Sequence, residues 1–230
     1  AEIQQYAYVW KNTSSPDWRE AALKTVLKDN KAADIESIYE IKQGLLYSVK
    51  VDESYYGPRK IWWQPKDNAK RQLIHDGSKE NILLMNILET EHDLYAMRMD
   101  ENIDRYDVVR IDLKRKRFVP IKGFVLTAAT YNYLDDAVAI PQGICMYGKD
   151  SEQTKSLLWF IPEQKTSPRI IKQAKDNEYF AGGLQAWGEN CYFTVVSSSK
   201  GLSEAELWLT QGTPETTRLI KKGVGFLRWW

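Results

Sequence analysis

The feature that most constrains the fold of this 230-residue chain is a repeat with a period near 48 residues. An apolar residue followed by tyrosine recurs after turn-prone segments, and these tyrosines are 48, 52 and 45 residues apart: Tyr47, Tyr95, Tyr147 and Tyr192. Further on, apolar strand anchors are 47, 50 and 49 residues apart, and three are followed directly by tryptophan: Trp62, Trp159 and Trp208. Self-similarity at such a period indicates an array of supersecondary units.

Each unit carries the signals of four short strands. Segments rich in Ile, Val, Tyr and Trp alternate with clusters of Gly, Pro, Asp, Asn and Lys that favour turns. The expected first strands are residues 35–41, 82–88, 125–131 and 179–184. One such unit cannot bury both faces of its sheet, so neighbouring units must stack radially. The sequence therefore predicts an all-β chain, a β-propeller with about five four-stranded blades.

A single propeller domain is expected over residues 1–230, with 1–29 and 223–230 together forming the closing blade. Counting 47 residues back from Leu73-Ile74 reaches Val26-Leu27, which indicates a fifth copy near the N-terminus. Pro16, followed by apolar residues at helical spacing up to Val26, predicts one short N-terminal helix in residues 15–29.

The amino-acid sequences of the strands resemble those of a known family. One unit contains three successive segments, Gly44–Ser48, Lys60–Trp63 and Arg71–Gly77. A similar sequence recurs in another unit at Glu206–Thr213. These segments resemble the blades of bacterial TolB-like propellers, loosely over residues 34–222. The resemblance implies a blade and no particular activity, and a five-bladed chain would be a variant of that usually six-bladed family. In architecture alone, five blades also resemble tachylectin-type lectin propellers.

Composition excludes several classes of function. Lys plus Arg is 32 and Asp plus Glu is 31, so the net charge of +1 provides no basic field for nucleic acid. The basic run Lys114–Arg117 is interpreted as a solvated turn. No uncharged stretch reaches the roughly 18 residues that a membrane helix needs, so no membrane span is expected. The chain begins at Ala1 without Met, which we interpret as a secreted or periplasmic protein after removal of a signal peptide.

No catalytic set, metal site or cofactor motif emerges. His75 and His92 are too few for a histidine-based zinc site, and the phosphate-binding loop and the nucleophile elbow are both missing. Asp100–Asp104 resembles a calcium loop but departs from it at its later positions, so a solvated turn is expected. Cys145 and Cys191 are predicted to be buried free thiols on opposite faces of different blades, too far apart for a disulfide.

The carboxylates support only an alternative function, that of a glycoside hydrolase or lyase. A glycoside hydrolase or lyase needs two acids at a defined separation. Candidates near turns or strand entrances are expected to be solvated turn residues: Asp34, Asp76, Asp93, Asp135, Asp136 and Asp176.

Aromatic residues that the repeat does not require are the candidate ligand-binding residues: Tyr55, Tyr56, Trp63 and Trp187. An exposed aromatic face can stack on a sugar or anchor a protein partner. The sequence thus favours a non-enzymatic binding module that recognises a protein or glycan with one face of the propeller. A third hypothesis is an assembly or inhibitor subunit whose partner protein completes the split blade.

Overall fold

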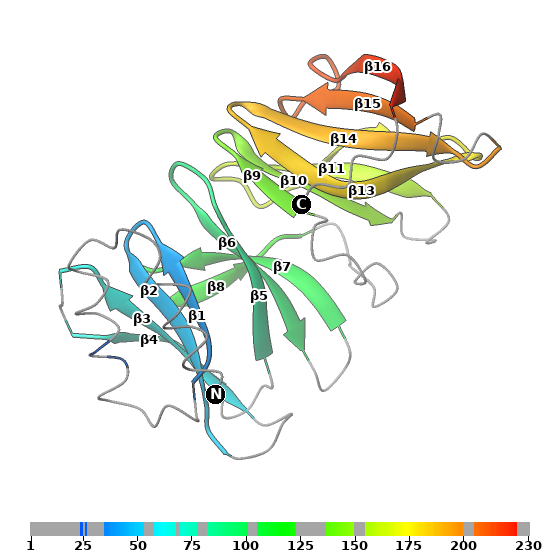
Figure 1. Cartoon of the computed structure of the whole chain (residues 1–230). Coiled ribbons are helices and arrows are strands. Elements are labelled where there is room, and N and C mark those ends of the chain that lie inside the picture. Colours follow the sequence, from blue (N-terminus) through cyan, green and yellow to red (C-terminus); the bar gives the residue numbers. More distant parts are fainter. Residues whose placement is uncertain are drawn as a thin grey trace. The chain divides into compact units, whose positions relative to one another are not determined.

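The chain is almost entirely β over the residues that the computed structural model describes: Lys24, Val26 and residues 35–52, 58–67, 70–77, 82–100, 105–122, 137–149, 155–199 and 205–224. Within them it forms four antiparallel sheets of four strands each, and in every sheet the strands pair in chain order (Figure 1). The predicted four-stranded units are confirmed. The proposed closing blade lies mostly outside the described residues, and its residues Gly223 and Val224 belong to the last strand of the fourth sheet.

The strands have the following bounds. The first sheet contains β1 (Ile35–Ile41), β2 (Gly44–Lys50), β3 (Arg59–Pro65) and β4 (Gln72–Asp76). The second contains β5 (Ile82–Glu89), β6 (Leu94–Asp100), β7 (Arg105–Asp112) and β8 (Arg117–Pro120). The third contains β9 (Ala137–Ile140), β10 (Gly143–Lys149), β11 (Ser156–Pro162) and β12 (Arg169–Gln173). The fourth contains β13 (Glu178–Trp187), β14 (Asn190–Ser197), β15 (Ala205–Thr210) and β16 (Arg218–Val224).

Three of the four expected first strands coincide with β1, β5 and β13. The expectation for the third sheet was wrong, because its first strand is β9 and not residues 125–131, which lie outside the described part of the chain. β9 is joined to β10 by the short turn at Pro141 and Gln142, and its residues pair directly across that turn. A hairpin connection this short fixes its first strand immediately before the turn, whatever apolar segment lies further upstream.

The described residues form two compact units. The first unit is drawn from Ala1–Leu84, Asp100–Asn102 and Asp112–Phe118. The second unit is drawn from Met85–Met99, Ile103–Ile111 and Val119–Trp230. In the first unit, Val26 is fully buried against Leu45 and Tyr47 of β2. Lys24 and Val26 are both helical, as expected for the N-terminal segment, whose other residues lie outside the description.

A buried ion pair braces the first sheet. Arg59 of β3 is 1% exposed, and its guanidinium binds both carboxylate oxygens of Glu36 in β1, with 2.9 Å between Nη2 and Oε1. Glu36 lies where the β1–β2 register shifts, so its side chain is free to reach across the sheet to β3. Two parallel hydrogen bonds of this kind fix the orientation of both side chains.

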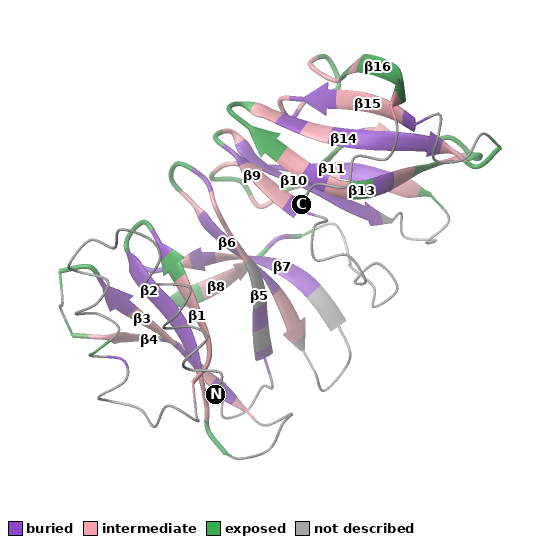
Figure 2. Ribbon diagram, viewed as in Figure 1, coloured by how far each residue is buried: buried purple, intermediate pink, exposed green. Residues whose placement is uncertain are grey.

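In the second unit, residues on both faces of the third sheet pack into core clusters, and Figure 2 draws the buried residues of its strands in purple. Residues of β10 alternate between two clusters: Ile144 and Met146 pack with Tyr95 of the second sheet, whereas Cys145 and Tyr147 pack in the cluster that holds residues of the fourth sheet. This alternation is the period-2 pattern of a strand between two neighbours, and it accounts for the near-continuous apolar sequence of β10.

The tryptophan marker of the repeat is structural. Trp62, Trp159 and Trp208 each oppose the fourth residue of the second strand in their sheet, which is Tyr47, Met146 or Phe193. The tyrosine marker fails this test: the tyrosine is fourth in β2 but fifth in β10 and third in β14. A shift of one residue reverses the face on which a side chain lies. The tyrosine spacing was therefore a wrong alignment, while the tryptophan spacing follows the architecture.

Candidate functional site

In the second unit, one end of three sheets is joined by contacts between turns. The turns after the first and third strands of a meander sheet share one end, because successive strands run in opposite directions. The Gln164 amide in the β11–β12 turn donates to Asp93 in the β5–β6 turn. Arg169, at the start of β12, donates from Nε to the Gly212 carbonyl in the β15–β16 turn over 3.0 Å. We call this end of the second unit the hairpin end.

Trp187 lies at the hairpin end and is 80% exposed. It is the last residue of β13 and pairs with Asn190 across a tight turn. Gly188 follows at a φ of +59°, and a Cβ added there would meet no atom within 4 Å. The other exposed large apolar side chains of the described residues are 39% to 46% exposed. The hairpin thus presents the Trp187 indole to solvent.

The other predicted ligand-binding residues do not join Trp187. Trp63 is a half-buried residue of β3 in the first unit, and its indole Nε1 donates to the Gln43 carbonyl over 3.3 Å. The indole N–H of Trp63 is therefore hydrogen-bonded to the β1–β2 turn. Tyr55 and Tyr56 lie outside the described residues.

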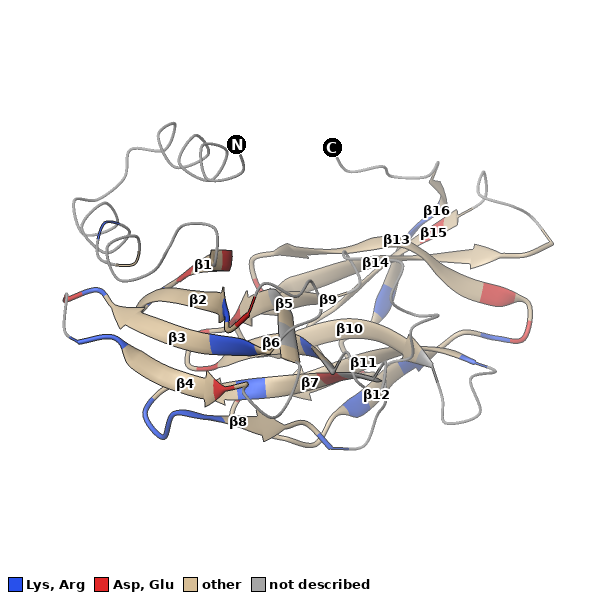
Figure 3. Cartoon of the chain, turned by 90° about the horizontal axis from the view of Figure 1, so that it is seen from below, with Lys and Arg blue, Asp and Glu red and all other residues tan. Residues whose placement is uncertain are grey.

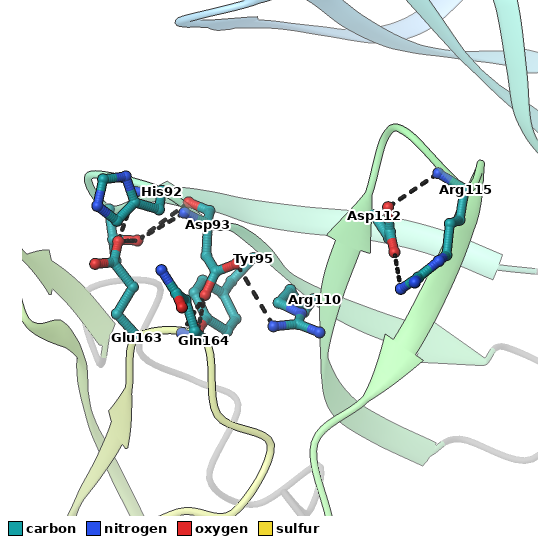
Figure 4. Close-up of polar contacts among 9 residues, drawn as sticks. His92, Asp93, Tyr95, Arg110, Asp112, Arg115, Glu163 and Gln164 are labelled. Atoms are coloured by element: carbon teal, nitrogen blue, oxygen red, sulfur yellow. Dashed lines mark hydrogen bonds and ion pairs between the residues drawn. The ribbon is translucent and has the colours of Figure 1, made fainter.

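A cluster of polar contacts joins the second sheet to the third at the hairpin end (Figure 4). The Glu163 carboxylate, from the turn after β11, accepts from the Thr90 hydroxyl over 2.6 Å and from the His92 amide over 2.5 Å. Partial burial acts to raise the pKa of Glu163, but hydrogen bonds from Thr90 and from the His92 and Asp93 backbone, together with the charge of His92, bring the pKa below its usual value. Glu163 is therefore held as an anion by the β5–β6 turn.

Asp93 makes the reciprocal contacts. Its carboxylate accepts from the Gln164 amide and from the Tyr95 hydroxyl, the latter over 3.0 Å, and lies 3.6 Å from the Arg110 guanidinium. Burial and then the negative charge of Asp93 raise the pKa of Tyr95, so the phenol stays protonated and donates. We call the contacts of Asp93 and Glu163 together the clasp.

The clasp corrects one expectation from the sequence. Asp93 is not a solvated turn residue, because a turn from the next sheet donates to its carboxylate. A hydrolase would need one carboxylic acid with a raised pKa to protonate the leaving group. The lowered pKa of Glu163 excludes it from that proton-donating role only. The arrangement suits alignment of two sheets better than proton transfer.

The remaining charged candidates are exposed where they are described, and they lie in turns except for Asp76, the last residue of β4, and Arg117, the first residue of β8. The basic run forms the exposed turn between β7 and β8, blue beside β8 in Figure 3, and the Arg115 amide donates to Asp112 over 2.9 Å. Asp76 and Asp176 are exposed. The other candidates lie outside the described residues: Asp34, Glu101–Asp104, Asp135 and Asp136. Within the described residues, no group of three or more His, Cys, Asp or Glu side chains could hold a metal ion.

Cys145 and Cys191 are buried free thiols, as predicted. Both belong to one core cluster between the third and fourth sheets. Where similar sheets stack in series, the front face of one sheet contacts the back face of the next. Two side chains on opposite faces of adjacent sheets therefore meet in the same interface.

No family model matches the chain, and no curated protein matches its sequence. Solved structures do resemble it. A prolyl endopeptidase structure has a TM-score of 0.54 at 12% identity, covering 95% of this chain and 37% of that one. The β-propeller domain of the Trilobed protease from Pyrococcus furiosus has a TM-score of 0.53 at 8% identity, covering 83% and 58%. An acylaminoacyl peptidase has a TM-score of 0.48 at 10% identity, covering 84% and 33%.

The chain thus spans less than two thirds of each of these structures. No helix among the described residues has the length and apolar character needed to cross a membrane. Four meander sheets and the likeness to a known propeller domain together establish the fold: this chain is a β-propeller.

Proposed function

We propose that this chain is a non-enzymatic binding module that recognises a partner protein through the hairpin end, with Trp187 as the anchor. The observation that carries the proposal is the 80% exposure of the Trp187 side chain. Leaving a tryptophan in water forgoes the free energy of burying it, roughly 2 to 3 kcal/mol for a large apolar side chain. Tryptophan is also enriched among the residues that dominate binding energy in protein interfaces.

The form of the site favours a protein over a glycan. Trp187 projects from the end of a hairpin, and the space beside Gly188 is open. A projecting indole can enter a pocket on a partner, which is how aromatic anchors act in protein interfaces. Recognition of a sugar would instead combine stacking with several convergent polar groups in a concave site.

The hairpin end is also fixed in shape. The clasp joins the second sheet to the third, and the contact between Arg169 and Gly212 joins the third to the fourth. A binding surface that is ordered before the partner arrives loses less conformational entropy on association. Loops carried by a rigid scaffold are where recognition residues are generally found.

A second candidate function is that of an accessory propeller that works beside a catalytic domain. It is favoured by the likeness to propellers of peptidases, of which this chain matches only a part. The captured partner would then be a peptidase or another enzyme. A TolB-like repeat and a secreted or periplasmic location also belong to this proposal, and they rest on the sequence alone.

The experiment is affinity capture from extracts of the native cell and its medium, with glycan-array binding measured on the same protein. The test variant is Trp187→Ala. Tyr179→Ala is the control, because Tyr179 is 39% exposed and stands near the other end of the same strand. We expect a stoichiometric protein partner to bind the wild type and the control variant, and to bind Trp187→Ala at least tenfold more weakly.

Equal capture by all three proteins would refute the role of Trp187. Saturable binding of a single glycan with no protein partner would replace the proposal with a lectin function. Trp187→Ala should leave the melting temperature unchanged, since the side chain contributes little buried area, so weaker capture cannot be ascribed to unfolding.

A further inference from the structure

The two cysteines occupy matched places in neighbouring sheets. Cys145 is the third residue of β10 and pairs with Val138 and Phe160. Cys191 is the second residue of β14 and pairs with Ala186 and Thr210. The difference of one position places the two side chains on opposite faces of their sheets. They therefore enter the same interface from its two sides, and both belong to the core cluster there.

Both side chains are 0% exposed, and this part of the interface is narrow. Cα atoms of β10 approach within 8 Å of β13, and Cα atoms of β9 approach within 8 Å of β14. Stacked sheets usually lie about 10 Å apart, whereas a disulfide needs a Cα separation of about 4.4 to 6.8 Å. The first strand of each sheet thus approaches the second strand of the other sheet more closely than in ordinary face-to-face packing.

The chemistry of the pair is consistent with direct contact. The pKa of the Cys191 thiol is raised well above its usual value, first by the hydrogen-bonding thiol of Cys145 and then by burial. A thiol with a raised pKa supplies little thiolate, the form that reacts in disulfide exchange. Two buried thiols in contact are consequently slow to react once the protein has folded.

We propose that Cys145 and Cys191 are the two halves of a disulfide that joins the third sheet to the fourth when the chain folds in the presence of a small-molecule disulfide. The thiolate of one cysteine attacks the small disulfide and displaces one thiol, which forms a mixed disulfide. The second cysteine then attacks the protein sulfur and displaces the other thiol. In total, two protein thiols are oxidised to one disulfide, and one small disulfide is reduced to two thiols.

Such a bond would link the third and fourth sheets covalently, in addition to their core packing and contacts such as that of Lys172 with the Trp208 ring. It would close a loop from residue 145 to residue 191, which restricts the unfolded chain and adds to stability. From the loop length we expect the oxidised protein to melt roughly 5 to 10 °C above the reduced protein.

The experiment is to refold the denatured, reduced full chain in a mixture of reduced and oxidised glutathione, and in reductant alone as the reference. The products are unfolded in excess alkylating reagent, and their masses are measured. We expect the glutathione product to be a monomer that is lighter than the fully reduced chain by two hydrogens, with no alkylated thiol. Peptide mapping should then join the peptides that contain Cys145 and Cys191.

Cys145→Ala and Cys191→Ala serve as single-thiol controls, which should take up one glutathione or one alkyl group and show no redox-dependent melting temperature. Recovery of two alkylated thiols from the wild type, or of glutathione mixed disulfides alone, would overturn the proposal. A disulfide that lowers the melting temperature would also overturn it, because the bond would then strain the interface that it is proposed to join.

Discussion

The Thr90 hydroxyl donates to the Glu163 carboxylate over 2.6 Å, although the two residues are 73 positions apart in the chain. The same carboxylate oxygen accepts from the His92 backbone amide. These bonds hold the β5–β6 turn of one sheet against the β11–β12 turn of the next. Local sequence provides no signal for such a pair, so its contribution has to be measured by substitution.

Glu163→Gln should destabilise the fold by about 0.5 to 1.5 kcal/mol at neutral pH, because the neutral amide accepts two hydrogen bonds less strongly than the carboxylate does. The exposure of the site keeps this value below that of a buried charged pair. Denaturant unfolding would measure it. Glu189→Gln, in the exposed β13–β14 turn, is the matched control and should change stability by less than about 0.5 kcal/mol.

The same pair of proteins should differ in their response to acid. The folded-state pKa of Glu163 lies below its unfolded value of about 4.3, so its contribution is complete above that pH and disappears as the pH falls through the folded-state pKa. The stability of the wild type relative to Glu163→Gln should therefore shrink below about pH 4. A difference that stays constant between neutral and acidic pH would contradict this account.

Gly212→Ala should destabilise the fold by about 2 to 4 kcal/mol. Gly212 has a φ of +94°, and a Cβ there would lie 2.5 Å from Cζ of Phe160, a side chain that is 1% exposed. Gly188→Ala is the control, since Gly188 also has a positive φ but its Cβ would meet nothing within 4 Å. It should cost only about 1 kcal/mol, the backbone contribution alone. Equal losses in thermal or chemical unfolding would show that the contact with the ring is unimportant.

Arg59→Met should cost about 1.5 to 3 kcal/mol, because it leaves Glu36, whose side chain is 21% exposed, without the guanidinium that binds both of its carboxylate oxygens. Arg71→Met provides the comparison. The Arg71 guanidinium lies 4.5 Å from the centre of the Trp62 ring, a cation–π contact worth about 0.5 to 1 kcal/mol at a partly exposed site. If the two substitutions reduced the free energy of unfolding equally, the buried ion pair would not be the brace described here.

The sequence predicted the sheets well because strand and turn signals are local. Pro and Gly mark the turns. Trp62, Trp159 and Trp208 recur in register because each lies at the same position of the third strand of its sheet. The tyrosine pattern misled because any strand offers apolar–tyrosine pairs, and spacing alone does not distinguish a shift of one residue.

The contacts between sheets could not be predicted in the same way. Asp93 stood out as an acid near a strand entrance, but its partner Gln164 is 71 positions away and belongs to another repeat. The faces of Cys145 and Cys191 were assigned correctly, but their place in one shared interface was not foreseen, because a sequence does not show which faces of neighbouring sheets contact each other. Of the candidate aromatic residues, Trp187 is exposed, whereas the indole N–H of Trp63 donates a hydrogen bond to the β1–β2 turn of its own sheet.

The open space beside Gly188 has a consequence for engineering. Its backbone already turns at a positive φ, and nothing packs against the position of a side chain there. Extra residues placed between Gly188 and Glu189 would extend outward without displacing the core, as exposed loop tips generally permit. This hairpin is therefore the place at which to graft an epitope or a fluorescent reporter, and also the place at which natural variation in length would change recognition while sparing the scaffold.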